Sequence, residues 1–156
     1  MSDHEGYTRT AARAILIDGQ DRVLLIWGCD PAKPDEGSWW YTPGGGVEPG
    51  ESFTEALRRE LQEEIGLEVD HVGEVIFEAT SRFEYDGREF HQRNLFFDVR
   101  VHEFQADLSA LSAEERKGIL SVHWLTLDEM RSTPHFIHPP TLPDIVANLL
   151  ASDRVT

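Results

Sequence analysis

The sequence predicts an α+β fold in which a mixed sheet is flanked by helices. Three observations predict it: apolar, strand-like segments come first, one strongly amphipathic helix follows, and further strands precede a final helix. With 156 residues, the chain is long enough for one compact domain with a single core. We therefore expect residues 1–156 to form a single domain, with the polar segment 1–8 flexible.

The segments before the central helix indicate strands because they are short, apolar or aromatic, and bounded by turn signals. Asp18-Gly19 separates the first two and predicts a hairpin. A loop with two prolines separates the second from the third. The third leads into Pro43 and three glycines, where the backbone must turn tightly or approach another group closely. The predicted strands are 11–17, 22–27 and 39–42, and the predicted loop is 28–38.

The best-defined predicted element is a helix over 52–65. Ser52 and Glu55 have the spacing of a capping box at its start, and Gly66 supplies a stop at its end. An apolar residue recurs at every fourth position, which is a helical stripe. The stripe consists of Phe53, Leu57, Leu61 and Ile65.

The second half of the chain predicts more strands and two helices. Asp86-Gly87 is a second hairpin signal. Residues 106–118 are polar and acidic, and we expect a loop there. The predicted strands are 72–79, 94–101 and 120–125, and the predicted helices are 126–131 and 141–151.

Three glutamates near the end of the central helix carry the functional prediction. On a wheel of about 100° per residue, Glu64 lies roughly 20° from Leu57, inside the apolar stripe. Glu60 lies at the edge of that stripe, roughly 60° from Leu57, and Glu63 roughly 120° away. Glu60 and Glu64 repel each other at i,i+4, oppose the helix dipole, and are costly to bury unpaired.

A divalent cation would relieve all three penalties at once. Oxygen ligands together with an anionic substrate favour Mg²⁺, with Mn²⁺ as a substitute. The glycines before the helix leave bare backbone that can offer a carbonyl to a metal or N–H groups to phosphate. The alternatives are a solvated acidic face paired with Arg58 and Arg59, and a plain turn at the glycines.

Residues 45–67 read GGVEPGESFTEALRRELQEEIGL and resemble the Nudix box, G-x5-E-x7-R-E-U-x-E-E-x-G-U, at all nine constrained positions. This resemblance implies an α/β/α sandwich with a mixed central sheet and the box as loop, helix, loop. It also implies a Mg²⁺-dependent hydrolase that cleaves a phosphoanhydride bond in a nucleoside di- or triphosphate or a nucleoside-diphosphate-linked compound.

The resemblance also assigns roles to individual residues. Arg59, paired with Glu51, would orient a box glutamate, and one box carboxylate would deprotonate the attacking water. The expected metal ligands are Glu60, Glu63, Glu64, the carbonyl of Gly44 and, from the later acidic segment, Glu115. The expected catalytic residues are Glu60, Glu63, Arg59 and Glu51.

Outside the acidic cluster, several side chains and backbone groups are candidates for binding substrate. Arginines contact phosphate, an aromatic ring stacks on a base, and glycine N–H groups bind anions. The alternatives are surface ion pairs for the arginines, core packing for at least one of the two adjacent tryptophans, and an exposed loop around Glu115. The candidates are Gly45, Gly46, Arg13, Trp39 and Arg93.

The overall charge restricts the partners. Asp and Glu total 29 against 14 Lys and Arg, a formal net charge of -15, which disfavours long nucleic acids. A small nucleotide-type substrate would therefore be brought in by the cation. Cys29 is the single cysteine, and we find no signal-peptide pattern and no membrane-length apolar run, so we expect a cytoplasmic protein without membrane contact.

The resemblance also implies one further expectation and two alternative activities. Family members often form a homodimer. Some Nudix-like domains bind a nucleotide or sugar nucleotide without hydrolysing it, and an isomerase occurs on the same fold. A binding module usually has a decayed box, whereas the box is intact here, and Cys29 does not lie in the context that the isomerase requires.

Overall fold

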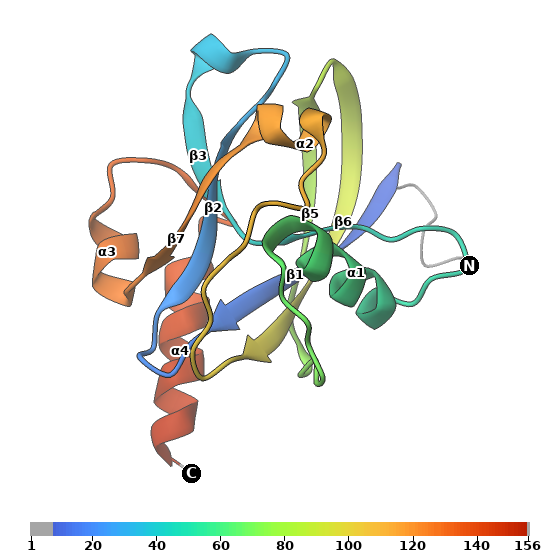
Figure 1. Cartoon of the computed structure of the whole chain (residues 1–156). Coiled ribbons are helices and arrows are strands. Elements are labelled where there is room, and N and C mark those ends of the chain that lie inside the picture. The colour runs from blue at the N-terminus through green and yellow to red at the C-terminus, as the bar shows by residue number, and fades with distance from the viewer. Residues whose placement is uncertain (1–7, 156) are drawn as a thin grey trace.

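The computed structural model describes residues 8–155 (Figure 1). In chain order its elements are β1 (Arg9–Ile17), β2 (Val23–Cys29), the 3-10 turn η1 (Pro34–Glu36), β3 (Ser38–Tyr41), β4 (Gly44–Gly46), α1 (Phe53–Ile65), β5 (Val75–Tyr85), β6 (Arg88–Arg100), α2 (Ala113–Gly118), β7 (Ile119–Leu125), α3 (Leu127–Ser132), β8 (Ile137–His138) and α4 (Leu142–Val155).

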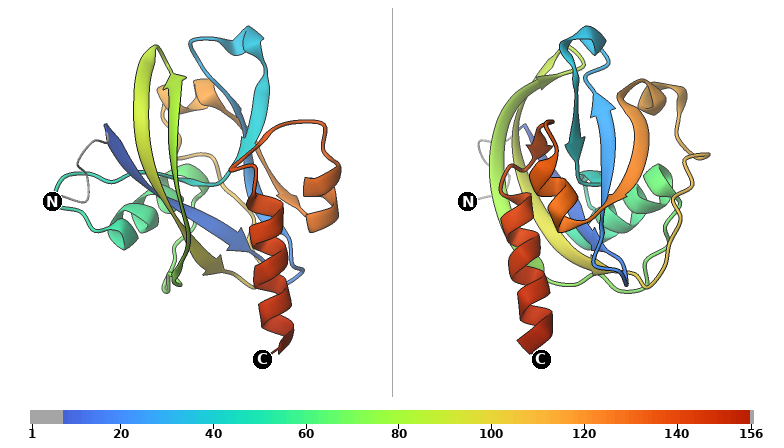
Figure 2. Two further views of the ribbon diagram at one scale, coloured as in Figure 1. Left: turned by 180° about the vertical axis from the view of Figure 1, so that it is seen from behind. Right: turned by 90° about the vertical axis from the view of Figure 1, so that its left-hand side faces the viewer.

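The strands of the described chain form one mixed sheet. Its main path is β5-β6-β1-β2-β3-β8, with β4 paired to β1 and β7 paired to β2. The pairs β1–β6 and β3–β8 are parallel, and the remaining pairs are antiparallel. The sheet is strongly curled, as the two turned views of Figure 2 show.

Helices cover both faces of this sheet, with α1 on one side and α4 on the other (Figure 2). Under α1, the apolar stripe packs against alternate residues of the first two strands, including Leu16 and Leu24. Ile15 and Leu25, which point the opposite way, pack with Leu142 and Val146 of α4. This layering confirms the α+β sandwich with a mixed sheet, because period-two alternation supplies an apolar surface to each face.

The predicted helix is confirmed with its start and stop signals. The Ser52 hydroxyl accepts the Glu55 N–H at 3.1 Å, and the Glu55 carboxylate accepts the Ser52 N–H at 3.2 Å. Gly66 ends the helix in a left-handed conformation with a φ of 72°. In the stripe, Leu57, Leu61 and Ile65 are buried, and Phe53 is partly buried.

The second hairpin is also confirmed, but its strands are longer than predicted. Asp86 and Gly87 both have positive φ values, 52° and 77°, as a tight primed turn requires. β5 and β6 extend to this turn through residues 80–93. These residues are largely polar, so they were not predicted as strands. The predicted start of the first of these strands at residue 72 was wrong by three positions.

Four elements were not predicted, and one of them is the 3-10 turn η1 inside the expected loop 28–38. The glycines at 44–46 form β4, and residues 106–118, predicted as a loop, contain α2. β8 has only two residues and depends on parallel pairing with β3. The first hairpin is confirmed, but its register pairs Ile17 with Val23, so the connecting loop is longer than a two-residue turn.

Residues 1–7 of the segment expected to be flexible lie outside the described residues. Its last residue, Thr8, is fixed to β6, because its N–H donates to the His91 carbonyl at 2.9 Å and its hydroxyl accepts the His91 N–H at 2.7 Å. Within residues 8–155, no helix is long and apolar enough to cross a membrane.

Candidate active site

The site is built where β4 lies between β1 and the end of α1. β4 pairs antiparallel with β1, with Gly44 opposite Arg13, Gly45 opposite Ala12 and Gly46 opposite Ala11. Each glycine leaves space that a neighbour uses. A methyl group on Gly44 would overlap the backbone of β1, and one on Gly45 would lie 2.5 Å from Cδ of Glu60. The run of glycines is therefore required by close approach on both sides.

Glu64 lies on the buried side of α1, as the wheel predicted, and only 7% of the residue is exposed. Its Oε1 accepts the N–H of Gly44 at 2.8 Å, which ties the helix end to the glycine strand. Burial, followed by the charge of Glu60, raises the pKa of Glu64 to about 8. A buried carboxyl group with this pKa is mostly protonated near neutral pH as long as no cation is bound.

Glu60 lies one helical turn earlier, against Gly45. Burial raises its pKa as well, while the adjacent Arg59 opposes that shift. The Glu60 Oε1 accepts Nη1 of Arg59 at 2.9 Å. Glu60 and Glu64 thus form a pair of carboxyl groups that interact electrostatically beside the glycine strand.

Arg59 connects the loop before the helix to the helix itself. Its guanidinium binds Glu51 through Nε at 2.8 Å and Nη2 at 3.0 Å, and Nη2 also donates to the carbonyl of Gly46 at 3.0 Å. The pKa of Glu51 is lowered to about 2, first by the hydrogen bonds from Arg59 and then by the N–H of Glu48. The expected pairing of Arg59 with Glu51 is present in the structure.

The other two acidic candidates, Glu63 and Glu115, form hydrogen bonds with residues other than Glu60 and Glu64. Glu63 has a side chain that is 51% exposed and accepts Arg59 Nη1 at 3.4 Å. Glu115 accepts the N–H of Ser112 at 3.0 Å in the capping box of α2, although its charge still acts on Glu64. Within residues 8–155, no three acidic, histidine or cysteine side chains are gathered closely enough to hold a metal ion as they stand.

Two arginines from β1 lie within electrostatic range of the acidic pair. Arg13 donates from Nη1 to the carbonyls of Thr42 at 3.3 Å and Gly44 at 3.0 Å, so the carbonyl expected to bind metal already has a donor. Arg9, four residues earlier on the same face, lies within electrostatic range of Glu60 and Glu64. Sequence reasoning selected Arg13 and missed Arg9.

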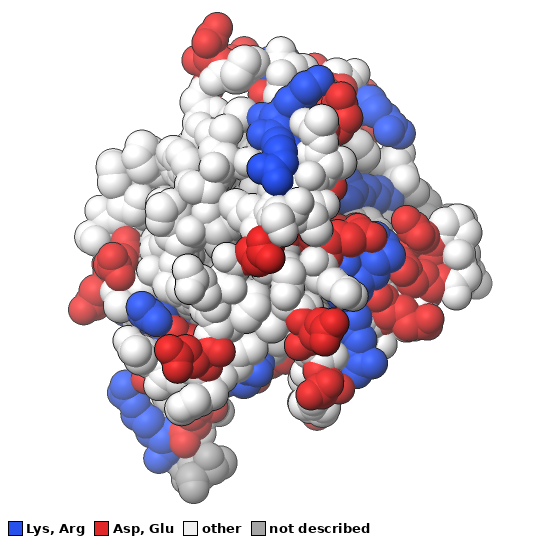
Figure 3. All heavy atoms as spheres, viewed as in Figure 1, with Lys and Arg blue, Asp and Glu red and all other residues white. Residues whose placement is uncertain are grey.

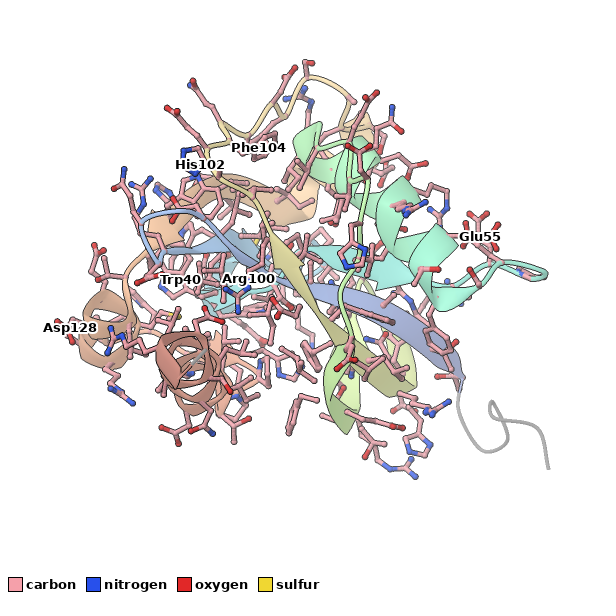
Figure 4. All side chains as sticks on the ribbon, turned by 90° about the horizontal axis from the view of Figure 1, so that it is seen from below. Trp40, Glu55, Arg100, His102, Phe104 and Asp128 are labelled. Atoms are coloured by element: carbon pink, nitrogen blue, oxygen red, sulfur yellow. The ribbon has the colours of Figure 1, made fainter. Side chains whose placement is uncertain are left out.

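Aromatic residues complete the surroundings. Trp39 lies beside Tyr41 with ring centroids 6.4 Å apart, whereas Trp40 turns to the other side of the sheet and packs with α3 and α4 (Figure 4). Burial and the charge of Glu64 raise the pKa of Tyr41. Tyr85, at the end of β5, lies within electrostatic range of Tyr41 and Arg9. Because side chains alternate along a strand, choosing Trp39 as a candidate also points to Tyr41 on the same face. No local sequence signal predicts that Tyr85 lies near these residues.

Arg93 is not brought to the acidic pair. It forms an ion pair with Glu78 on β5, with Nε and Oε1 2.5 Å apart, and lies over the ring of Phe53 at the start of α1. Figure 3 shows this mixture of acidic and basic side chains around α1, at the right of the view. The placement matches the ion-pair alternative considered for this residue.

Comparison with known proteins agrees with this arrangement. The NUDIX domain model matches residues 7–148. The chain is 37% identical over 98 residues to a CTP pyrophosphohydrolase from Escherichia coli K12, covering 60% of this chain and 69% of that protein. It is 35% identical over 124 residues to an RNA pyrophosphohydrolase from Ruthia magnifica, covering 79% of this chain and 65% of that protein. It spans only 16% of the human 8-oxo-dGDP phosphatase NUDT18 that it also matches.

Solved structures share the fold. The MutT protein from Methanosarcina mazei superimposes with a TM-score of 0.65 at 20% identity, over 93% of this chain and 94% of that one. The Escherichia coli ORF135 protein superimposes with a TM-score of 0.60 at 26% identity, over 92% and 89% of the two chains.

Fold and site together define a small α+β domain in which a loop-helix-loop segment presents acidic side chains beside the edge of a mixed sheet. The chain belongs to the Nudix hydrolase family, since the family model covers nearly its whole length.

Proposed function

We propose that this chain is a metal-dependent hydrolase that cleaves a phosphoanhydride bond in a nucleoside di- or triphosphate or a nucleoside-diphosphate-linked substrate. The observation that carries the proposal is the position of Glu64. Its carboxylate is buried against the N–H of Gly44, forms no ion pair within the described residues, and interacts with a second carboxylate, Glu60. Such a pair is costly to maintain unless it binds something positive.

The residues fit a divalent cation. The donors are all oxygens, which favours Mg²⁺, with Mn²⁺ as a substitute. Glu60 and Glu64 would hold the ion, joined by Glu63, the Gly44 carbonyl and Glu115. The last three have other partners in the structure, namely Arg59, Arg13 and Ser112, so binding through them requires exchange of those hydrogen bonds.

When bound, the cation would neutralise phosphate oxygens and make a water molecule more acidic. The chain's own groups supply the rest. Glu51 fixes Arg59, and Arg59 in turn fixes Glu60 through a 2.9 Å hydrogen bond. Glu60 or Glu63 would accept the proton of the attacking water. Arg13 and the N–H groups of Gly45 and Gly46 would bind phosphate, and Trp39 would stack on the base.

The proposed substrates are small nucleotides. One relative is named for CTP, and a similarly folded structure is a Caenorhabditis elegans Ap4A hydrolase. Other relatives are named for RNA, but the net charge of -15 disfavours contact with a long phosphate backbone. A homodimer stays a prediction, which sedimentation of the purified chain would test.

The decisive experiment is a substrate panel with Mg²⁺ that includes CTP, other nucleoside triphosphates, ADP-ribose and dinucleoside polyphosphates. We expect release of phosphate, pyrophosphate or a nucleoside monophosphate from at least one member, and loss of that activity in Glu64→Gln. Full activity in the variant would overturn the mechanism. Binding of a nucleotide without turnover of any panel member would favour the non-hydrolysing binding module.

Metal binding has its own readout. A ligand that binds only the folded state raises the melting temperature. We expect millimolar Mg²⁺ to stabilise the wild-type chain, and to have less effect on Glu60→Gln and Glu64→Gln. Melting curves that do not respond to Mg²⁺ in any of the three proteins would support an acidic face without a metal.

A further inference from the structure

Arg9 is the first residue of β1 and reaches over the glycine strand. A methyl group on Gly46 would lie 2.6 Å from Arg9 Nε and 3.1 Å from Nη2, so the guanidinium occupies the space that Gly46 leaves free. Gly45, the preceding residue, leaves space for the carboxyl group of Glu60 in the same way. One short strand therefore accommodates a basic and an acidic side chain at consecutive positions.

The contacts of Arg9 leave its hydrogen-bond donors unused. Its Cζ lies 5.7 Å from the centroid of the Phe90 ring, a cation–π contact that orients the guanidinium without binding its N–H groups. Within the described part of the chain, Arg9 has neither a hydrogen bond nor an ion pair, although it is half-buried. A guanidinium carries five N–H donors, and leaving them unpaired in a half-buried position is unfavourable.

Arg13 differs in this respect. Its Nη1 donates to two backbone carbonyls, one of them Gly44, so it is fixed at the start of β4. Arg9 lies over Gly46, two residues further along β4, which at the rise of a strand is on the order of 7 Å away. Burial, followed by the like charge of Arg13, lowers the pKa of Arg9, while Glu60 and Glu64 oppose that shift. A multiply charged anion lying along β4 would relieve this repulsion.

We propose that Arg9 is a second substrate-binding residue of this site and binds a phosphate group other than the one held near Arg13. The planar guanidinium matches two phosphate oxygens at once, which an ammonium group does not. The two phosphates of the substrate's diphosphate would therefore be bound at opposite ends of β4. This inference rests on the proposed function, since it concerns the same substrate.

The test compares Arg9→Gln with Arg88→Gln. Arg88 is a matched control because its Cζ lies 5.5 Å from the same Phe90 ring, yet Arg88 is exposed at the start of β6. The probe is methylenediphosphonate, which cannot be hydrolysed, titrated calorimetrically in the presence of Mg²⁺. We expect Arg9→Gln to weaken its binding about tenfold or more and Arg88→Gln to leave it unchanged.

Titration with Mg²⁺ alone separates anion binding from damage to the site. Because Arg9→Gln removes a positive charge near two carboxylates, its Mg²⁺ affinity should equal or exceed that of the wild type. Arg9→Lys keeps the positive charge but loses the planar guanidinium with its paired N–H donors. It should therefore also bind the diphosphonate more weakly than the wild type. Wild-type affinity in Arg9→Gln or Arg9→Lys, or an equal loss in Arg88→Gln, would overturn the assignment.

The two proposals fail separately. A wild-type chain that binds the diphosphonate through Arg9 but hydrolyses no nucleotide would refute the hydrolase and leave the assignment of Arg9 intact. A chain that hydrolyses nucleotides with an unchanged KM in Arg9→Gln would refute only the role of Arg9.

Discussion

Arg59 and Glu51 form a bidentate ion pair, in which Nε lies 2.8 Å from Oε2 and Nη2 lies 3.0 Å from Oε1. The same guanidinium reaches Glu60 at 2.9 Å and the carbonyl of Gly46 at 3.0 Å. One side chain thus positions the loop before α1, the glycine strand and a proposed metal ligand relative to one another. This parallel pairing depends on planar geometry as well as charge.

The first prediction is that Arg59→Lys lowers kcat by about 10- to 100-fold, the usual effect of losing a residue that orients a metal ligand. Lysine retains the positive charge but cannot hold Glu51, Glu60 and Gly46 together. Steady-state kinetics at saturating Mg²⁺ on the best panel substrate would measure the loss.

Arg58→Lys is the control for that prediction. Arg58 is the preceding residue, and its Nη2 donates to the carbonyl of Asp70 at 2.8 Å, away from the acidic pair. Its kcat should remain within about twofold of the wild type, as expected for an exposed substitution. Equal losses in both variants would show that the positioning role of Arg59 is wrong.

The second prediction concerns the pH dependence of stability in the metal-free chain. The pKa of Glu64 is about 8 in the folded chain against an ordinary value of 4.5, so the folded state keeps a proton that the unfolded state has released. This contribution is fully present below about pH 4.5 and is lost as the pH rises through 8. The free energy of unfolding should therefore fall by a few kcal/mol across that interval.

Glu64→Gln isolates this effect, because glutamine can still accept the Gly44 N–H but does not titrate. Chemical denaturation in EDTA from pH 5 to pH 8.5 would compare the two proteins. The wild type should lose more stability than the variant as the pH rises. Parallel curves for the two chains would contradict the assignment of a raised pKa to Glu64.

The third prediction tests the space between Gly45 and Glu60. A Cβ at position 45 would lie 2.5 Å from Cδ of Glu60 and 2.7 Å from Oε1. Gly45→Ala should therefore displace that carboxylate, destabilise the chain by about 1–3 kcal/mol, and lower activity about tenfold or more. Thermal melts and kinetics would measure both effects.

A shorter side chain at position 60 provides the check. The double variant Gly45→Ala/Glu60→Asp should melt at a higher temperature than Gly45→Ala, because aspartate withdraws the carboxyl group from the added methyl. Activity should stay low, since the carboxylate no longer reaches its original position. A double variant that is no more stable than Gly45→Ala would show that the strain lies elsewhere.

The sequence was most informative where side-chain periodicity and local caps determine the structure. The stripe from Leu57 to Ile65 predicted both the buried face of α1 and the burial of Glu64. The helix over 113–118 was missed although Ser112 and Glu115 form the same kind of capping box as Ser52 and Glu55. Its few residues lack an apolar stripe, so the capping box was the one sequence signal that could have revealed this helix.

The remaining errors depend on pairing between distant segments. Arg93 was considered for phosphate binding because it was expected to open a strand, but β6 begins at Arg88, and Arg93 turns to the side of the sheet where Phe53 lies. Arg9 was overlooked because the first strand was expected to begin at Ala11, whereas parallel pairing with β6 extends it to Arg9. Tyr85 reaches the site because the curled sheet brings the end of β5 close to it.

The fourth prediction concerns Glu115, proposed above as an additional metal ligand. Its carboxylate accepts the Ser112 N–H at 3.0 Å, and its charge acts on Glu64. Glu115→Gln keeps an acceptor for the cap but removes the charge, so the melting temperature should change little. If the wild-type carboxylate leaves the cap to bind the cation, Glu115→Gln should lower activity about tenfold and raise the Mg²⁺ concentration for half-maximal activity.

Glu114→Gln is the matched control, since Glu114 is exposed and pairs with Lys117 at 3.0 Å. An Mg²⁺ dependence that is identical in the two variants would restrict Glu115 to its capping role and leave the cation to the glutamates of α1.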